Sequence, residues 1–312
     1  MKIILTGAAG YIGQCLEKML KTKNVILLDK KSLNYKTDRQ FYKMNLLYRR
    51  NLDYLFGKER ISTIIHLAGE SVVDEKKKYS QYYNNNIQVT KNILWAMKKY
   101  KCKNLIFSST ASVYKSINKP VTELSEVAPK SKYARSKLQC EKLIKKTNNN
   151  FIILRFFNVA SSLPSLLRGE NHTPETHLIP LFIQNILQEK KLKIYGKNYP
   201  TKDGTCVRDF IHIKDICYAI IKCTNYLRKK NIREILNIGT NKGFSVLEIL
   251  KNIKAISKMD IRYSFESKRK GDEPFLVSNF KKTSNMLNWT PKNSNIKKII
   301  SDEIKWKKIN LN

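Results

Sequence analysis

Short apolar runs alternate with longer amphipathic stretches through the first half of the chain. The apolar runs predict buried strands at Lys2–Thr6, Asn24–Leu28, Ile61–Leu67, Lys103–Phe107 and Phe151–Phe157. Each run is continuous and does not alternate with polar residues, which is typical of strands covered on both faces by helices. This half of the chain therefore predicts a layered domain around a parallel sheet.

The amphipathic stretches between these runs predict helices at Tyr11–Leu20, Gln81–Tyr100 and residues 131–146. Repeated strand–helix–strand order is the pattern of a parallel sheet with helices on both faces. We therefore expect an α/β fold built on a Rossmann-type doubly wound parallel sheet.

The regular alternation of predicted strands and helices ends after Asn158. Residues 161–180 hold several prolines and predict a long loop, followed by a helix at Leu181–Leu187, a loop at Tyr195–Cys206 and a strand at Ile235–Ile238. We expect a dinucleotide-binding domain over residues 1–160, with segments near 205–240 returning to it. Residues 161–312 would then form mainly a smaller α/β C-terminal substrate domain.

The chain is strongly basic, with 60 Lys and Arg against 25 Asp and Glu and a net charge of +35 over 312 residues. The lysines are spread along the whole chain and do not gather in one arm or one helix, so the charge favours solvated faces over a nucleic-acid partner. No apolar run reaches the roughly 18 residues of a membrane span. Thr6-Gly7 interrupts the apolar start before an export signal could form.

Cysteine and histidine spacing adds to this picture. The six cysteines form no CxxC pair, which favours a reduced, cytoplasmic protein over a disulfide scaffold. The four histidines lack the close helical spacing of a zinc site, so we expect no metal. His172 and His177 could approach each other on a loop, but ordinary hydrogen-bonding roles fit them better.

A glycine-rich turn follows the first predicted strand directly. Gly7-Ala8-Ala9-Gly10-Tyr11-Ile12-Gly13 opens the first helix. Glycine at these points lets backbone N–H groups approach a pyrophosphate at a helix N-terminus. The alternative is a plain strand-to-helix turn, but the position after an N-terminal strand favours a dinucleotide site.

Asp29 ends the second predicted strand, shortly after this turn. A carboxylate there accepts hydrogen bonds from adenosine ribose hydroxyls and repels a 2′-phosphate, which favours NAD over NADP. Lys30 and Lys31 argue mildly for NADP, but lysine is common throughout the chain. We therefore expect NAD.

Tyr133 and Lys137 lie four residues apart on a predicted helix and so share one face. A cation beside the phenol favours its ionised form, and the positive ring of an oxidised nicotinamide acts in the same direction, so Tyr133 would be a base near neutral pH. Ser108-Ser109-Thr110 ends the fourth predicted strand, where a hydroxyl could reach the same substrate oxygen. We predict a catalytic group of Tyr133, Lys137 and Thr110.

These residues together resemble the extended short-chain dehydrogenase/reductase family. The second half is similar to its UDP-glucose 4-epimerase branch through Arg155–Asn158, Pro174–Pro180, Tyr195–Tyr199, Asp203–His212 and Arg269–Pro274. The resemblance runs over nearly the whole chain. It implies that the enzyme interconverts UDP-glucose and UDP-galactose by oxidation at sugar C4, rotation of the 4-keto sugar and reduction of its opposite face.

The resemblance also assigns residues to this reaction. It implies that Tyr133 takes the proton from the 4-hydroxyl, that Thr110 bridges substrate and tyrosine, and that Lys137 binds nicotinamide-ribose hydroxyls. The implied cofactor contacts are Gly7, Gly10, Tyr11, Ile12, Gly13, Asp29, Ala68, Asn85, Ser108, Tyr133 and Lys137. The implied substrate contacts are Thr110, Tyr133, Asn158, His177, Leu178, Arg208, Arg269 and Asp272. A homodimer is also implied.

The sequence also leaves other functions open. A nucleotide-sugar 4,6-dehydratase would place acidic residues after Thr110, where this chain has Ala111-Ser112. A decarboxylase fits the C-terminal motifs poorly. A non-catalytic NAD- or nucleic-acid-binding relative is motivated by the charge and by departures from the family pattern at Asn45, Ser71 and Lys115.

Overall fold

The computed structural model describes residues 1–73, 76–170, 174–228, 231–269 and 271–311. The chain divides into two compact units. The first contains Met1–Val113, Ala128–Arg155 and Ala219–Leu236, and the second contains Tyr114–Val127, Phe156–Tyr218 and Asn237–Asn312. Residues 114–127 thus belong to the second unit, an excursion that the hydrophobic pattern did not predict.

The first unit is built on a seven-stranded sheet with strand order β10-β6-β5-β4-β1-β2-β3. The ladders from β3 to β5 are all parallel. The strands are β1 (Lys2–Thr6), β2 (Val25–Asp29), β3 (Phe41–Lys43), β4 (Ile61–His66), β5 (Asn104–Thr110), β6 (Asn150–Phe156) and β10 (Arg233–Ile238). The predicted α/β fold with a doubly wound parallel sheet is confirmed.

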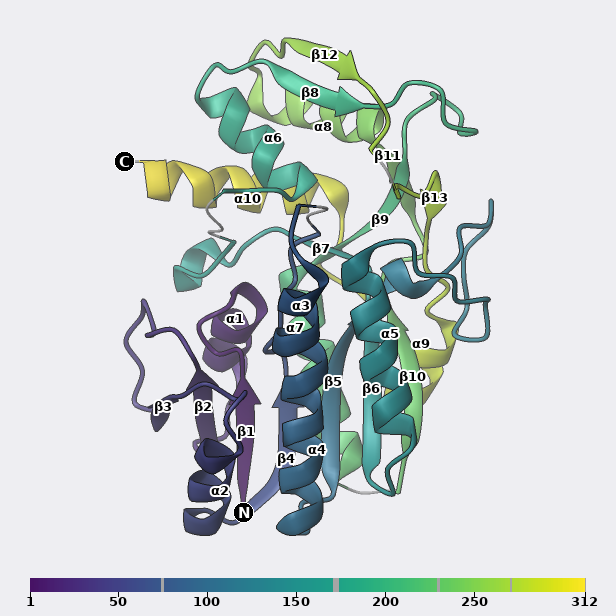
Figure 1. Cartoon of the computed structure of the whole chain (residues 1–312). Coiled ribbons are helices and arrows are strands. Elements are labelled where there is room, and N and C mark those ends of the chain that lie inside the picture. The colour runs from purple at the N-terminus through teal and green to yellow at the C-terminus, as the bar shows by residue number, and fades with distance from the viewer. Residues whose placement is uncertain (74–75, 171–173, 229–230, 270, 312) are drawn as a thin grey trace. The chain divides into compact units, whose positions relative to one another are not determined.

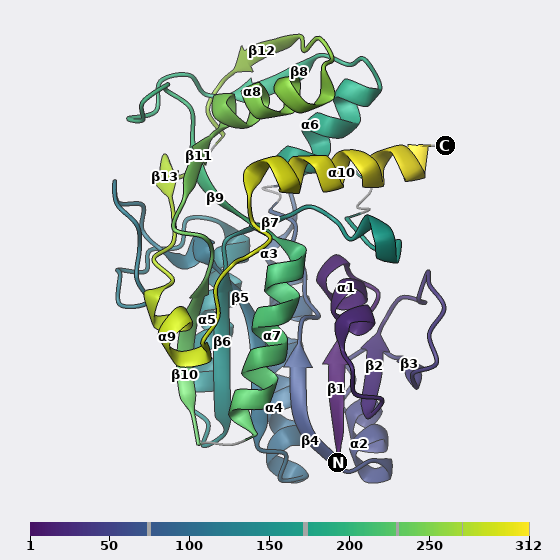
Figure 2. The same ribbon diagram turned by 180° about the vertical axis from the view of Figure 1, so that it is seen from behind.

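Helices cover both faces of this sheet (Figures 1 and 2). The front layer of Figure 1 holds α2 (Arg49–Lys58), α4 (Val89–Lys99) and α5 (Lys132–Lys145), while α1 (Tyr11–Met19) and α7 (Ile213–Leu227) lie behind. The helix predicted over 81–100 is interrupted: α3 (Tyr79–Tyr82) leads into a π-helix, η1 (Tyr83–Gln88), before α4 begins. Such π-turns often accompany functional sites.

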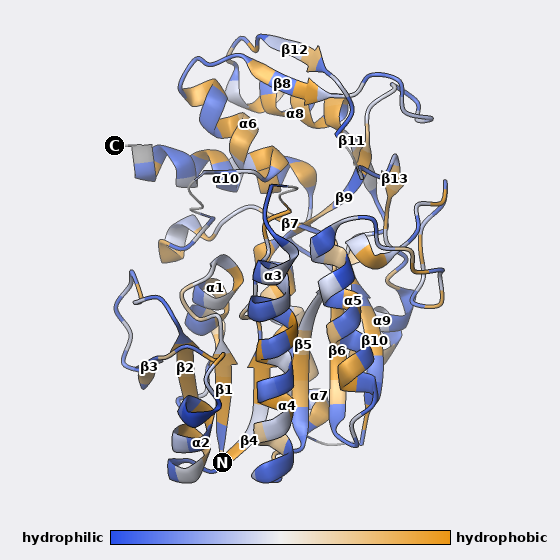
Figure 3. Ribbon diagram, in the orientation of Figure 1, coloured by the Kyte–Doolittle hydropathy of each residue, from blue (hydrophilic) through white to orange (hydrophobic). Residues whose placement is uncertain are grey.

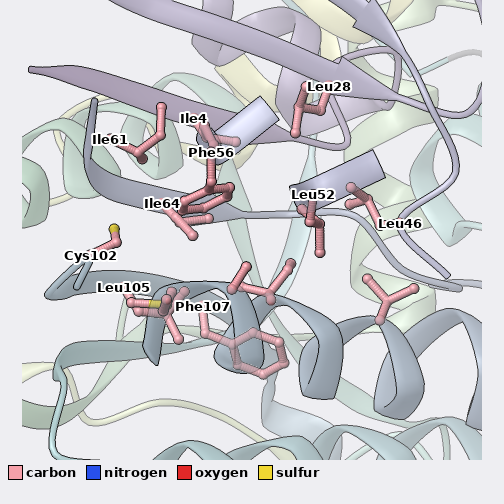
Figure 4. Packing of buried hydrophobic residues seen from close by; sticks show 14 of the residues in the cluster. Ile4, Leu28, Leu46, Leu52, Phe56, Ile61, Ile64, Cys102, Leu105 and Phe107 are labelled. Carbon is pink, nitrogen blue, oxygen red and sulfur yellow. The ribbon is translucent and has the colours of Figure 1, made fainter. Parts of the chain in front are cut away.

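Apolar side chains fill the space between the sheet and the front helices. Ile4, Leu28, Ile64 and Phe107 from the strands pack with Leu52 and other residues of α2, α4 and α5 (Figure 4). The strands are mostly apolar while polar residues collect on the outer faces of the helices (Figure 3). This burial is what the continuous apolar runs predicted, because a strand between two helical layers has no solvent face.

The second unit has its own small sheets and core. In one sheet β9 (Val207–His212) pairs with β7 (Asn158–Ala160), β11 (Gly243–Ser245) and β13 (Phe275–Leu276), and in the other β8 (Leu192–Tyr195) pairs with β12 (Tyr263–Glu266). The longer helices are α6 (Leu178–Leu187), α8 (Val246–Ser257) and α10 (Ile296–Leu311), and a short helix α9 spans Lys281–Leu287. Ile183, Ile253 and Ile299 belong to the core that these helices share. The helix predicted at Leu181–Leu187 begins three residues earlier, at Leu178.

No helix among the described residues is long and apolar enough to cross a membrane.

His66, at the end of β4, is a buried neutral histidine. Its ring bonds to Thr6 Oγ1 at 2.9 Å and to Thr90 Oγ1 at 3.3 Å. Burial, with a smaller contribution from the charge of Lys137, lowers the pKa of His66 to about 3. Between pH 6.5 and about pH 3, His66 is protonated in the unfolded chain and neutral in the folded chain. The unfolded chain therefore binds more protons in this range, and acidification destabilises the fold.

We therefore expect the free energy of unfolding to fall by about 2 kcal/mol from this residue between neutral pH and about pH 5. Urea unfolding of the wild type and of His66→Gln at both pH values measures the effect. The variant should show the flatter pH dependence, and equal slopes for the two proteins would refute the assignment.

Candidate active site

The turn between β1 and α1 has space only for glycine at two positions. Gly7 has φ +74°, and a Cβ added there would lie 2.7 Å from the backbone nitrogen of Ala68. A Cβ on Gly13 would lie 2.0 Å from the carbonyl oxygen of Gly7. The start of α1 therefore packs directly on the turn, which leaves a side-chain-free backbone cradle of the kind that accepts a pyrophosphate.

The Asp29 carboxylate lies beside this cradle at the end of β2. It accepts hydrogen bonds from the N–H of Ala9 (3.0 Å to Oδ2) and the N–H of Lys31 (2.9 Å to Oδ1). Each oxygen keeps a further lone pair for a ribose hydroxyl. Lys30 instead donates to Asn85 Oδ1 at 3.0 Å, so its ammonium is directed toward η1.

The structure brings the three predicted catalytic residues together within the first unit. Ser131 caps α5 by accepting a hydrogen bond from Ala134 N–H, which places Tyr133 in the first turn and Lys137 one turn later. Thr110, the last residue of β5, is hydrogen-bonded to Tyr133. The Lys137 ammonium donates to the carbonyl oxygen of Ser108 at 2.8 Å.

Burial sets the electrostatics of the tyrosine. Although Tyr133 is only half-buried, desolvation raises its pKa to about 12, and the hydrogen bond to Thr110 offsets this only in part. Burial also lowers the pKa of Lys137 to about 8. The predicted ionisation of Tyr133 relies on two cations, Lys137 and an oxidised nicotinamide ring. Among the protein groups alone, desolvation dominates the pKa of Tyr133, and the Lys137 ammonium donates to Ser108. Ionisation of the phenol needs additional positive charge.

Asn86 is a site residue whose role the sequence did not resolve. It is buried in η1, where its side-chain amide donates to Ser136 Oγ at 2.8 Å and accepts from the N–H of Glu70 at 2.7 Å. A Cβ on Gly69 would lie 2.7 Å from Asn86 Oδ1 and 3.5 Å from Lys137 Nζ. Asn86 thus supports the loop after β4, whereas its neighbour Asn85 is half-exposed.

A pocket that is open to solvent lies within the second unit. Three of the predicted substrate residues, Leu178, Arg269 and Asp272, lie in its wall. The full lining is Thr176, Leu178, Leu181, Phe182, Lys193, Ile194, Tyr195, Cys206, Val246, Arg269 and Asp272. A mainly apolar lining with a few charged groups suits a nucleoside with attached phosphates.

Two predicted arginines are held at or beside this pocket. The Arg269 guanidinium carbon lies 3.8 Å from the centroid of the Tyr195 ring. Arg208 approaches Asp272 at 3.7 Å and donates to the carbonyl oxygen of Glu273 at 2.6 Å. Both side chains are therefore preoriented, and a guanidinium is the group best shaped for a phosphate.

His177 and Leu178 lie at the N-terminus of α6, and Asn158 begins β7. Burial lowers the pKa of His177, but its bond to Glu175 (3.0 Å) and the charge of Glu170 outweigh burial and raise it overall. The ligand-type atoms of Glu170, Glu175 and His177 lie within 4.8 Å of one another. Lys307 Nζ, 3.5 Å from Glu175, already supplies positive charge to these carboxylates. His172 lies outside the described residues.

The parallel sheet, the glycine turn and the tyrosine–lysine helix define a dinucleotide-dependent enzyme of the Rossmann class. Comparison with known proteins narrows the class: the chain belongs to the NAD dependent epimerase/dehydratase family, whose model matches residues 3–239.

Relatives match over essentially the full length. A UDP-glucose 4-epimerase of Lactobacillus helveticus is 34% identical, with 99% of this chain and 97% of the relative covered. The Bacillus subtilis UDP-glucose 4-epimerase is 31% identical, with 100% and 98% covered. The crystal structure of the Bifidobacterium longum UDP-glucose 4-epimerase, in complex with NAD+ and UDP, has a TM-score of 0.91 at 27% identity and covers 100% of this chain and 99% of that one.

Proposed function

We propose that the chain is an NAD-dependent isomerase that interconverts UDP-glucose and UDP-galactose, with the activity EC 5.1.3.2. The observation that carries the proposal is the group formed by Tyr133, Thr110 and Lys137 in the same unit as the glycine cradle. The full-length similarity to UDP-glucose 4-epimerases supports it.

The residues of the first unit fit NAD. Backbone N–H groups from Gly7 to Gly13, including those of Tyr11 and Ile12, would meet the pyrophosphate, and Asp29 would hold the adenosine ribose. Ala68, Asn85, Ser108 and Lys137 complete the proposed cofactor contacts. When bound, NAD+ supplies the hydride acceptor and donor at sugar C4 together with a positively charged ring.

The chain's own side chains then handle the proton. We assign Tyr133 as the base that takes the proton from the sugar 4-hydroxyl and later returns it. Thr110 orients the shared oxygen through its hydrogen bond to Tyr133. Lys137 supplies positive charge, and its bond to Ser108 fixes where that charge lies.

The second unit would hold the nucleotide. Arg208 and Arg269 are assigned to the UDP phosphates, Asp272 to a ribose hydroxyl, and Asn158 with the backbone of His177 and Leu178 to the remaining UDP-sugar contacts. The pocket that contains Leu178, Arg269 and Asp272 supports this assignment.

Arg269→Leu should raise KM for UDP-galactose by about 10- to 100-fold, because a charge-assisted phosphate contact contributes about 1.5–3 kcal/mol. Its kcat should change little, because Arg269 takes no part in the proposed proton transfer. Steady-state kinetics measure both constants. Lys268→Leu removes the same charge one residue away, from a lysine bonded to the carbonyl oxygen of Asn198, and should leave KM nearly unchanged. Equal KM values for the two variants would remove Arg269 from the phosphate site.

The chain lacks what water elimination requires. Ala111 follows Thr110 in the sequence and is buried, and Ser112 comes next, so no acidic side chain stands where a dehydratase needs one. Incubation of the protein with UDP-galactose and identification of the nucleotide sugar formed tests this directly. We expect UDP-glucose. A dehydrated or decarboxylated sugar would overturn the proposed activity.

We further propose that the protein works in the cytoplasm, as a homodimer and without a metal. The cytoplasmic assignment is supported by the six cysteines, which are all buried and form no disulfide among the described residues. The dimer is supported by the family resemblance. NAD and the side chains named above provide the redox and proton chemistry, so the reaction has no step that calls for a metal.

A further inference from the structure

A charged pair lies almost wholly inside the first unit, next to the catalytic group. Glu141 on α5 and Arg155 on β6 are 1% and 3% exposed. The guanidinium donates to both carboxylate oxygens, at 3.0 Å from Nε and 2.7 Å from a terminal nitrogen. The hydroxyl of Ser109, also buried, donates to the same carboxylate at 2.5 Å.

A buried ion pair needs a reason, because replacing such a pair with apolar side chains is often neutral or stabilising. We infer that the Glu141–Arg155 pair is a positioning device for the proposed proton transfer: it holds α5 against β5 and β6 and keeps the Lys137 ammonium charged beside Tyr133. This inference rests on the proposed function.

The geometry accounts for the positioning. Glu141 lies one helical turn beyond Lys137, which lies one turn beyond Tyr133. Ser109, its partner on β5, directly precedes Thr110. The Glu141 carboxylate thus connects α5, which carries Tyr133 and Lys137, to β5, which carries Thr110. Arg155 connects the same carboxylate to β6.

The charge on Lys137 is the second part of the role. Burial lowers the pKa of Lys137 to about 8, close to physiological pH, and the negative charge of Glu141 opposes this shift. Cys140 opposes it only as a thiolate, and burial raises the pKa of that thiol. Glu141 is therefore the anion that keeps the ammonium protonated, and Arg155 balances Glu141 in the apolar interior.

The other titratable groups near the site do not take over this task. His66 on β4 has a pKa lowered to about 3 and is neutral at physiological pH. Tyr82 on α3, whose ring centroid lies 6.4 Å from that of Tyr133, raises the pKa of Tyr133 when ionised.

The test is the pH profile of kcat for UDP-galactose. In Glu141→Gln the alkaline limb, where Lys137 loses its proton, should move about one unit to lower pH, because the anion that stabilises the ammonium is gone. Glu141→Gln/Arg155→Met should show the same shift, and it leaves no unpaired buried charge to unfold the protein. Arg155→Lys keeps the positive charge but cannot donate to both carboxylate oxygens in the same geometry. Its kcat should therefore fall several-fold, while the pH of the alkaline limb and KM stay unchanged.

Glu17→Gln is the matched control. Glu17 on α1 is also buried and pairs with an arginine, Arg39, at 3.1 Å, so the variant should lose thermal stability without any shift of the limb. A wild-type alkaline limb in the folded Glu141 variants, or a wild-type kcat in Arg155→Lys, would overturn the inference. If the wild type itself turns over no UDP-galactose, the proposed function fails instead.

Discussion

Tyr133→Phe should lower kcat for UDP-galactose by about 10³-fold, within the range of about 10²–10⁴ that a positioned acid or base contributes. The substitution removes one oxygen, the atom that is hydrogen-bonded to Thr110 and that would exchange a proton with the sugar 4-hydroxyl. Because the ring stays in place, KM should change little. Initial rates at saturating substrate measure the effect.

Tyr82→Phe is the matched control for this variant. Tyr82 is fully buried, and its hydroxyl donates to the carbonyl oxygen of Val72 at 2.8 Å. Loss of that hydroxyl should reduce stability by about 1 kcal/mol and leave kcat within a few-fold of the wild type. If Tyr133→Phe turns over substrate as fast as Tyr82→Phe, Tyr133 is not the base.

Gly13→Ala should abolish tight NAD binding. The added Cβ would lie 2.0 Å from the carbonyl oxygen of Gly7, so the first turn of α1 must move away from the cradle. Because binding depends on backbone N–H groups placed by that turn, we expect the Kd for NAD to rise by about 100-fold or more, which corresponds to about 2.7 kcal/mol. Isothermal titration of the protein with NAD+ measures it.

Two other glycines provide graded controls. In Gly10→Ala the Cβ would lie 3.3 Å from the same Gly7 oxygen, so the loss of affinity should be milder. Gly57 lies in α2, and a Cβ there meets nothing closer than the Tyr100 hydroxyl at 3.9 Å. Gly57→Ala should leave NAD binding intact and stabilise the protein by up to about 1 kcal/mol. Equal affinities in Gly13→Ala and Gly57→Ala would show that the turn does not bind the pyrophosphate.

The buried strands were predictable because each is a short, unbroken apolar run. Lys2–Thr6 matches β1 residue for residue, and Asn24–Leu28 and Ile61–Leu67 match β2 and β4 to within one residue at each end. Less buried elements were missed. β3 has three residues, none of them buried, and α2 buries only Leu52, Leu55 and Phe56 among charged neighbours. Neither offers a strong periodic signal.

The candidate site divides in a similar way. The spacing of four residues placed Tyr133 and Lys137 on one helix face, and the end of a strand placed Thr110 within reach of them. The proximity of these three residues was therefore predictable from local sequence patterns. The pKa of Tyr133 was not, because desolvation depends on side chains that pack around the phenol from several elements. The Glu141–Arg155 pair was hidden for a different reason: Arg155 falls in a predicted buried strand, but nothing in the sequence identifies Glu141 as its partner.

The central claim is that one hydrogen leaves sugar C4 and returns to C4 of the same sugar. UDP-galactose deuterated at C4 tests it when the product is analysed by NMR. The account predicts UDP-glucose with deuterium retained at C4, because bound NAD carries that hydrogen without exchange with water. Deuterium at another carbon, or protium from solvent at C4, would contradict it.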